Sequence, residues 1–296
     1  MVGIRKSLEG FNWPSPKSNG SELSIHQILE KSPEGSSPLS QQVIDCLSVW
    51  NNFLGLFDAA EKLPSFPIWS MEFGATYPYD KDSLSRVPLQ DLRRAKGCFG
   101  QPLSRLDRTQ IYDRVPSHAR GPRGVFPRWK KQFIKQNREF FEKHREKIEP
   151  WLTSIMRFPP SLQKLEWNCQ GELRDIWKYV IQFRASGVRV KRPNTSPSLV
   201  AMTSTQIPII AWERRYMTVH ECARLQSMGE LKHFPVGLPA MRALGNAVNV
   251  RVVEGIISNL VSLLALQKPE TTLSRRRVAK ASSNEQDTEG SCRLAS

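Results

Sequence analysis

Residues 184–203 hold the densest group of side chains that could bind phosphate. Four cations fall within nine residues, next to Ser and Gly and ahead of a Pro-bounded loop. Side chains of these types contact nucleic-acid phosphates, and base edges become reachable when the segment carrying them enters a groove. We expect a strand and turn that face DNA. The candidate DNA-binding residues are Arg184, Ser186, Arg189, Lys191 and Arg192.

A second group of functional side chains lies around residues 218–226. Thr218 precedes Glu221 by three residues, the spacing at which hydroxyl and carboxylate satisfy the first free N–H groups of a helix. Arg224 and Gln226 then lie on the opposite side from the buried face and can bond neighbouring loops. Cys222 lies inside this helix without a base beside it, which argues against a nucleophilic role.

Gly245-Asn246 predicts a turn, followed by a helix with one apolar stripe. The free N–H groups at the start of such a helix suit an anionic or carboxylate-bearing ligand. The alternative is that Asn246 only caps the helix. The stripe consists of Val248, Val252, Val253, Ile256, Ile257 and Leu260.

The composition favours a polyanionic partner. The 296 residues suffice for one large or two modest domains, and 43 Lys and Arg against 28 Asp and Glu give a net charge of +15. A generally basic surface is the alternative. Five scattered cysteines without a C-x-x-C pair indicate a reducing compartment and no structural zinc. Without a membrane-length apolar run or a signal-peptide pattern, we expect a cytoplasmic protein and no membrane partner.

The elements that must position these groups follow from periodicity. Residues 43–54 and 172–183 predict helices, the second burying Leu173, Ile176, Trp177 and Val180. Residues 127–148 predict a basic amphipathic helix whose cations could follow a phosphate backbone, with a solvated Lys/Glu-paired helix as the alternative. Its inward side chains are expected to be Trp129, Phe133, Ile134, Phe140 and Phe141, and its outward ones Lys130, Lys131, Lys135, Arg138, Lys143 and Arg145.

Two ordered blocks resemble the last two motifs of the DNA cytosine-C5 methyltransferases. The string from Arg214 to Met228 resembles the ninth motif, roughly R-x-L-T-x-R-E-x-A-R-L-Q, and Gly245-Asn246-Ala247-Val248 resembles the tenth, G-N-S/A-V before an apolar helix. Residues 2–14 resemble the end of the eighth motif, with a strand end at Val2 to Ile4 and a F-x-W-P-like segment. The resemblance covers roughly residues 1–14 and 184–265.

The resemblance implies a fold and a site. The fold is an α/β fragment: a mixed α+β target-recognition domain followed by the C-terminal helices of a class I S-adenosylmethionine-dependent methyltransferase. Thr218, Glu221, Arg224, Gln226 and Gly245 become scaffold residues, and Asn246 and Ala247 become contacts to the cofactor's amino-acid end. Ala247 replaces a Ser of the family pattern, which removes a hydroxyl contact.

The chain lacks the residues that carry out the family's chemistry. Cytosine C5 becomes nucleophilic after a thiolate adds to C6, and the base must be flipped out of the duplex. No Cys follows a Pro, and neither a Glu-Asn-Val segment nor a Gly-rich first motif occurs. We expect no catalytic residue and no metal ligand in this chain.

The expected protein is therefore the DNA-reading half of a split restriction-modification enzyme. Its partners would be duplex DNA and a second polypeptide that carries the catalytic motifs and completes the S-adenosylmethionine site. A stand-alone DNA-binding protein and an inactive truncated product are the alternatives. The expected divisions are 1–14, a strand end; 15–42, a linker or peripheral loop; 43–200, the recognition region; 201–266, motifs nine and ten; and 267–296, a disordered tail.

Overall fold

The computed structural model describes residues 8–15, 23–80, 83–120, 126–201, 203–235 and 237–266. The predicted strand end at Val2 to Ile4 and the predicted disordered tail at 267–296 lie outside these residues. The chain forms two compact units, one of residues 18–250 and one that combines residues 1–17 with 251–296.

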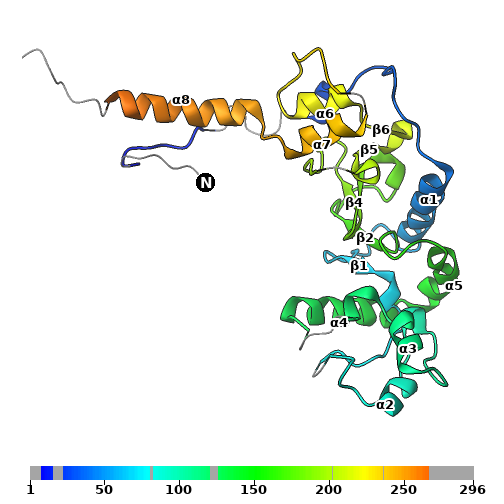
Figure 1. The fold of residues 1–296 in the computed structure, drawn as a ribbon. Coiled ribbons are helices and arrows are strands. Elements are labelled where there is room, and N and C mark those ends of the chain that lie inside the picture. The colour runs from blue at the N-terminus through cyan, green and yellow to red at the C-terminus, as the bar shows by residue number, and fades with distance from the viewer. Residues whose placement is uncertain are drawn as a thin grey trace, which may run out of the picture. The chain divides into compact units, whose positions relative to one another are not determined.

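The larger unit is built on a mixed six-stranded sheet with the order β1-β2-β4-β3-β5-β6. β2 and β4 are parallel, and all other neighbours are antiparallel. The larger unit is therefore a mixed α/β structure (Figure 1). The strands are β1 (Ile68–Trp69), β2 (Lys164–Trp167), β3 (Val180–Arg184), β4 (Gly187–Lys191), β5 (Ile209–Ile210) and β6 (Arg215–Tyr216).

Eight α-helices and several short 3-10 turns are present among the described residues. The helices are α1 (Gln41–Gly55), α2 (Leu89–Arg94), α3 (Arg108–Arg114), α4 (Arg128–Lys143), α5 (Arg145–Met156), α6 (Val219–Leu225), α7 (Leu238–Asn246) and α8 (Val250–Leu266).

The helix predicted at residues 43–54 is confirmed as α1, whose apolar face forms the centre of the largest core. Trp50 and Phe53 are fully buried and pack against Trp151 of α5. The indole N–H of Trp50 donates to the Leu162 carbonyl at 2.8 Å, and that of Trp151 donates to the Val49 carbonyl at 2.8 Å. Both polar ends of the buried indoles are thus satisfied.

The helix predicted at residues 172–183 is wrong. The structure has a 3-10 turn at Ile176–Lys178 and then β3, which lies between β4 and β5. The first four β3 residues are all buried, because a central strand is covered on both faces. A short apolar run of this kind does not distinguish a helix from such a strand. Leu173, expected to be buried, is 60% exposed.

The helix predicted at residues 127–148 is two helices. α4 ends at Lys143, and His144 has non-helical φ and ψ before α5 begins. Phe141 and Ile134 are buried as expected, but Trp129 is 56% exposed, so its inward placement is wrong. Arg138, expected outward, turns instead toward the buried carboxylate of Glu72, with Nη2 3.0 Å from it.

Residues 69–143 fold around a second core, and we call this segment the basic module. Its buried side chains include Met71, Tyr77, Leu92, Ile111 and Ile134. α4 is held from its inner side: the Asn137 side-chain oxygen accepts from the Trp69 amide at 2.7 Å, and Asn137 Nδ2 donates to the Pro67 carbonyl at 3.0 Å. These bonds fix which face of α4 is exposed.

A third core joins α6 and α7 to the far end of the sheet. Residues 23–40 have mostly irregular backbone, yet they also belong to this layer. Ile25 is buried in it, and the Leu39 and Tyr216 amides donate to the Arg214 and Ser37 carbonyls. The segment is therefore integrated with β6 rather than detached from it.

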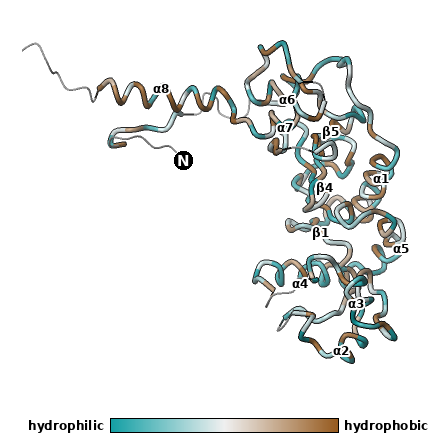
Figure 2. Tube along the Cα trace, in the orientation of Figure 1, coloured by the Kyte–Doolittle hydropathy of each residue, from teal (hydrophilic) through white to brown (hydrophobic). Residues whose placement is uncertain are grey.

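In the smaller unit, described residues 8–15 lie alongside α8 (Figure 1). Asn259 Nδ2 donates to the Asn12 carbonyl at 2.8 Å, and Gly255 lies against the ring of Pro14. The predicted apolar helix is confirmed, although it begins at Val250. Most of its apolar side chains are exposed to solvent. The hydropathy colouring in Figure 2 marks hydrophobic residues along the length of α8. The exposed ones are Val250, Val252, Ile257, Val261, Leu264 and Leu266.

Leu238–Leu266 is long and apolar enough to be considered a candidate membrane span. Residues 247–249 are not helical, however, and α7 buries Ala240, Met241 and Leu244 within the larger unit. α8 alone has 17 residues. At 1.5 Å per residue it is about 26 Å long, less than the roughly 30 Å of a bilayer core. This stretch is two helices with different surroundings.

Candidate functional site

Glu221 is the centre of a buried hydrogen-bonded network at the start of α6. Its carboxylate is fully buried and accepts from both terminal nitrogens of Arg215, each at 2.8 Å. The backbone N–H groups of Thr218 and Glu30 donate to it at 2.9 Å. The Glu221 N–H returns a bond to the Thr218 hydroxyl at 3.1 Å, so the predicted capping box is confirmed.

These bonds lower the pKa of Glu221. Burial by itself would raise the pKa of the carboxyl, but hydrogen bonds from Arg215, Glu30 and Thr218 favour the charged form and outweigh burial. The carboxylate is therefore ionised in the folded protein at neutral pH. With four donors around it, it meets the condition under which a buried charge is tolerated.

The same network anchors the segment before α1. The Glu30 carboxylate accepts from the Thr218 hydroxyl at 3.1 Å and from Arg224 Nη2 at 3.0 Å, and Arg224 Nη1 donates to the Ile28 carbonyl at 2.9 Å. The expectation that Arg224 bonds a neighbouring loop is confirmed. Sequence reasoning missed Glu30, because it lies almost two hundred residues from its partners and no local pattern indicates it.

Gln226 and Asn249 join the end of α6 to the connection between α7 and α8. Gln226 Nε2 donates to the Leu244 carbonyl at 2.9 Å and the Ala247 carbonyl at 3.2 Å. Asn249 Nδ2 donates to the Leu225 carbonyl at 2.9 Å. The role expected of Gln226 is confirmed, and Asn249, which the sequence analysis did not single out, makes the reciprocal contact.

The turn predicted at Gly245-Asn246 lies two residues later. Both residues belong to the last turn of α7, and the chain leaves helical geometry at Ala247–Asn249. A helix ending is compatible with the same local sequence because Gly is favoured near helix C-termini as well as in turns. Asn246 is exposed and Ala247 half-buried, and a cofactor contact by either remains a prediction.

The five candidate DNA-binding residues lie on or beside the β3–β4 hairpin, and the predicted strand and turn are confirmed as β4 and residues 185–186. Arg189 pairs with Glu166 at 2.7 Å, Arg192 pairs with Glu172 at 3.1 Å, and Arg184 donates to the Gln182 side chain at 2.6 Å. Ser186 is exposed and Lys191 half-buried. Two of the four cations are thus neutralised within the chain, and DNA contact here remains a prediction.

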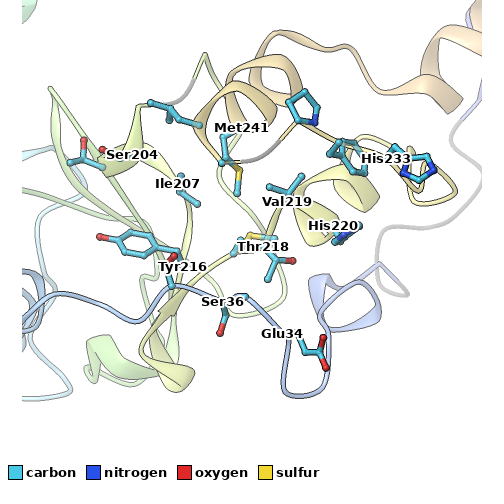
Figure 3. A pocket seen from close by; sticks show the side chains of 18 of the residues that line it. Glu34, Ser36, Ser204, Ile207, Tyr216, Thr218, Val219, His220, His233 and Met241 are labelled. Carbon is cyan, nitrogen blue, oxygen red and sulfur yellow. The ribbon is translucent and has the colours of Figure 1, made fainter.

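A cavity of about 760 Å³ opens beside the Glu221 network (Figure 3). Its walls come from three segments: residues 34–37, residues 204–220 and the α6–α7 connection. Apolar side chains of Ile207, Val219 and Met241 share it with the polar groups of Ser36, Thr218 and His220. The cavity is wide and amphipathic, and Glu221 itself lies behind its wall.

The Cys222 thiol is fully buried. Burial, followed by the neighbouring charge of Glu221, raises the pKa of Cys222 to about 12. Cys46 and Cys169 are buried too, and burial raises each pKa to about 12. None of these three thiols is available as a thiolate near neutral pH.

We expect iodoacetamide at about pH 8 to leave Cys222 unmodified in the native protein, because on the order of one thiol in 10,000 is ionised when its pKa is near 12. Peptide mass spectrometry after a short exposure measures this, and protein alkylated in denaturant serves as the positive control. Native labelling of Cys222 as fast as in denaturant would show an accessible, reactive thiol and contradict the burial of Cys222 in α6.

Among the described residues, no cluster of three or more His, Cys, Asp or Glu side chains could hold a metal ion. The candidate site in the described part of the chain is therefore a scaffold around Glu221, a cavity next to it and a hairpin with partly neutralised cations.

Comparison with known proteins finds a similar methyltransferase. The chain is 40% identical over 270 residues to the type II methyltransferase M.AluI of Cellulosimicrobium cellulans. This chain resembles part of a methyltransferase. The match covers 86% of the chain and 50% of the relative, so the chain spans about half the length of that protein. No family model matches. No solved structure matches either.

Proposed function

We propose that the chain is the DNA-recognition and scaffold part of a DNA cytosine-C5 methyltransferase. The whole enzyme would transfer a methyl group from S-adenosylmethionine to cytosine in duplex DNA, on a class I methyltransferase fold in the cytoplasm. The observation that carries the proposal is the 40% identity to a type II methyltransferase over 86% of the chain. The two ordered motifs, at 214–228 and 245–248, support the cytosine-C5 class.

We assign the chemistry to a part of the enzyme outside these 296 residues. Addition of a thiolate to cytosine C6 needs an accessible nucleophile, and burial raises the pKa of each cysteine in the described part of the chain, Cys46, Cys98, Cys169 and Cys222, to about 12. The chain matches about half of the relative, which agrees with catalytic residues in another part of the enzyme. This chain would contribute positioning and DNA contact.

α8 supplies a surface to which the rest of the enzyme can bind. Its exposed apolar side chains include Val252, Ile257 and Val261, each more than 50% exposed. Apolar surface on this scale favours a protein neighbour that covers it. We therefore assign α8 to the contact with the catalytic part.

For S-adenosylmethionine, this chain offers a limited set of groups. Asn246 carries an exposed amide that makes no hydrogen bond to another described residue, and its amide could bond the carboxylate or amino group of the cofactor. The cofactor, when bound, supplies the electrophilic methyl group. The chain's own part is to hold the α7–α8 connection, through Gln226 and Asn249, at the position from which Asn246 would reach the cofactor.

The test is reconstitution. The chain is co-expressed with the part of M.AluI that it does not match, supplied as a second polypeptide, and the pair is purified and incubated with duplex DNA and methyl-labelled S-adenosylmethionine. We expect label in DNA only when both parts are present, and 5-methylcytosine after digestion to nucleosides. Each part alone is the control. Label in another base would contradict the cytosine-C5 assignment, and co-purification without any transfer would contradict the proposed activity.

A further inference from the structure

The N-terminal half of α4 carries an exposed basic surface that lies outside the DNA contacts predicted at the β3–β4 hairpin. The basic module, residues 69–143, has sixteen Lys and Arg against eight Asp and Glu. About a quarter of the chain thus carries more than half of its net charge of +15. No acidic residue occurs in α4 before Glu139.

The cations of α4 form a defined face. Arg128, Lys131 and Lys135 are spaced i, i+3 and i+7, so they follow one another along one side of the helix. Arg128 makes no ion pair with the residues that the structure describes, and Lys135 and its partner Glu139 are both largely exposed, 3.7 Å apart. Lys131 donates to the Asp80 carbonyl, which positions the ammonium without neutralising it.

This arrangement is unfavourable in the free protein. The N-terminal end of a helix carries partial positive charge, and cations there destabilise the helix. Three cations, Arg128, Lys130 and Lys131, nevertheless lie within the first four positions of α4. A bound polyanion would convert this repulsion into attraction.

Trp129 adds an aromatic surface at the same place. It is 56% exposed, whereas Phe141 on the same helix is buried. Its ring has Phe133 edge-on behind it at 5.8 Å and the Lys130 ammonium 5.8 Å from its centroid. An exposed indole among cations can stack on a nucleobase or insert at a base step, which a uniformly charged helix cannot do.

We infer that the exposed N-terminal half of α4 is a DNA-contacting surface, with the cationic face of Arg128, Lys131 and Lys135 on phosphates and Trp129, on the flank beside that face, against an unstacked base. The inference rests on the proposed function, because a methyltransferase acting on a flipped base needs a duplex opened at its target. It assigns the main phosphate contacts to the basic module rather than to Arg189 of β4 and Arg192 just after it, which are paired with acids of the same chain.

The test uses fluorescence anisotropy with the full chain, alone and with the complementary part. The probes are a labelled duplex of about 30 base pairs, the same duplex with one central mismatch, and labelled polyglutamate, each measured over about 50 to 200 mM salt. The variants are R128A/K131A/K135A, W129A and W129F. A charge-matched control, K62A/R157A/K178A, removes three exposed cations outside the basic module.

We expect the α4 triple variant to reduce the slope of log affinity against log salt by about 2 to 3, and the control variant to leave it nearly unchanged. W129A should weaken binding to the mismatched duplex about tenfold with little change in slope, and W129F should recover most of the loss. Equal slopes for the two triple variants would overturn the phosphate assignment. If W129A lost as much affinity for polyglutamate as for DNA, the proposed stacking of Trp129 on a base would be overturned.

The two proposals can fail separately. If the wild-type pair transfers methyl groups and the α4 variants bind DNA as it does, this inference fails and the proposed function stands. If the wild-type protein binds duplex DNA through α4 without methyl transfer in the pair, the proposed function fails and a stand-alone DNA-binding protein is favoured. Thermal unfolding of every variant confirms that binding losses do not come from unfolding.

Discussion

Replacing Glu221 with alanine is expected to destabilise the protein by about 3 to 5 kcal/mol, the usual cost of removing one partner of a buried ion pair. The substitution leaves the 6%-exposed side chain of Arg215 without its bidentate partner and leaves the N–H groups of Thr218 and Glu30 unpaired. Denaturant unfolding monitored by circular dichroism measures the loss. Because the network holds residues 28–30 against α6, the attachment of that segment should weaken too.

Glu213 provides a matched control for this prediction. It pairs with the same Arg215, but its own side chain is 37% exposed. Water can solvate the space that Glu213 leaves, and Arg215 keeps its two bonds to Glu221, so Glu213→Ala should cost far less than Glu221→Ala. Similar losses for the two variants would mean that the burial of Glu221 does not determine the stability of the network.

The lowered pKa of Glu221 sets the direction of the pH dependence. A carboxyl whose pKa is lower in the folded than in the unfolded protein stabilises the fold above its unfolded pKa, and this contribution is lost as pH falls through the folded pKa. The stability difference between wild type and Glu221→Gln should therefore narrow as pH falls from about 6 to about 3. A constant difference across this range would mean that ionisation of Glu221 contributes nothing.

The parts of the fold that could be predicted from sequence depend on neighbouring residues. The Thr218 capping box needs two side chains three positions apart, and α1 needs one apolar face, so both patterns are complete within a short segment. The contacts of Arg224 and Gln226 were anticipated because their side of α6 has to meet other chain segments. In each case the residues within one short segment are enough to predict the structure.

The parts that could not be predicted depend on distant segments. β3 became a strand because β4 and β5 cover its edges, and these partners are not visible within residues 172–183. Trp129 was placed inward by periodicity, whereas the inner face of α4 is set by Asn137 and by the pairing of Arg138 with Glu72. Glu30 likewise belongs to the α6 network only through tertiary structure.

The candidate site follows the same rule. Its scaffold residues were found because their motif is local and ordered. The DNA contacts expected at the β3–β4 hairpin rest on local charge density and on the Ser, Gly and Pro residues around it. The acids that pair with Arg189 and Arg192, Glu166 and Glu172, lie about twenty residues earlier in the chain. Charge density in sequence locates cations, and tertiary pairing decides which of them remain available for phosphate.

Gly245→Ala is expected to be the other severe substitution, with a loss of more than about 3 kcal/mol in unfolding free energy. A Cβ added there would lie 1.6 Å from the Val200 carbonyl oxygen and 2.3 Å from its carbon. Both are backbone atoms that cannot rotate away, so α7 would have to move and lose the packing of Met241 and Leu244. The backbone of Val200 comes so close to Gly245 that only a residue without a Cβ fits there. This contact explains why the last turn of α7 contains a glycine.

Gly55→Ala is the matched control, because Gly55 is also the last turn of a helix and a Cβ there meets nothing within 4 Å. Alanine at that position should leave stability unchanged or raise it by up to about 1 kcal/mol. Thermal and denaturant unfolding of both variants separates the effect of contact from the effect of helix propensity. If Gly245→Ala unfolds like wild type, residues 200–201 must pack more loosely against α7 than the structure shows, and the α7–α8 connection would then lose its proposed fixed position for Asn246.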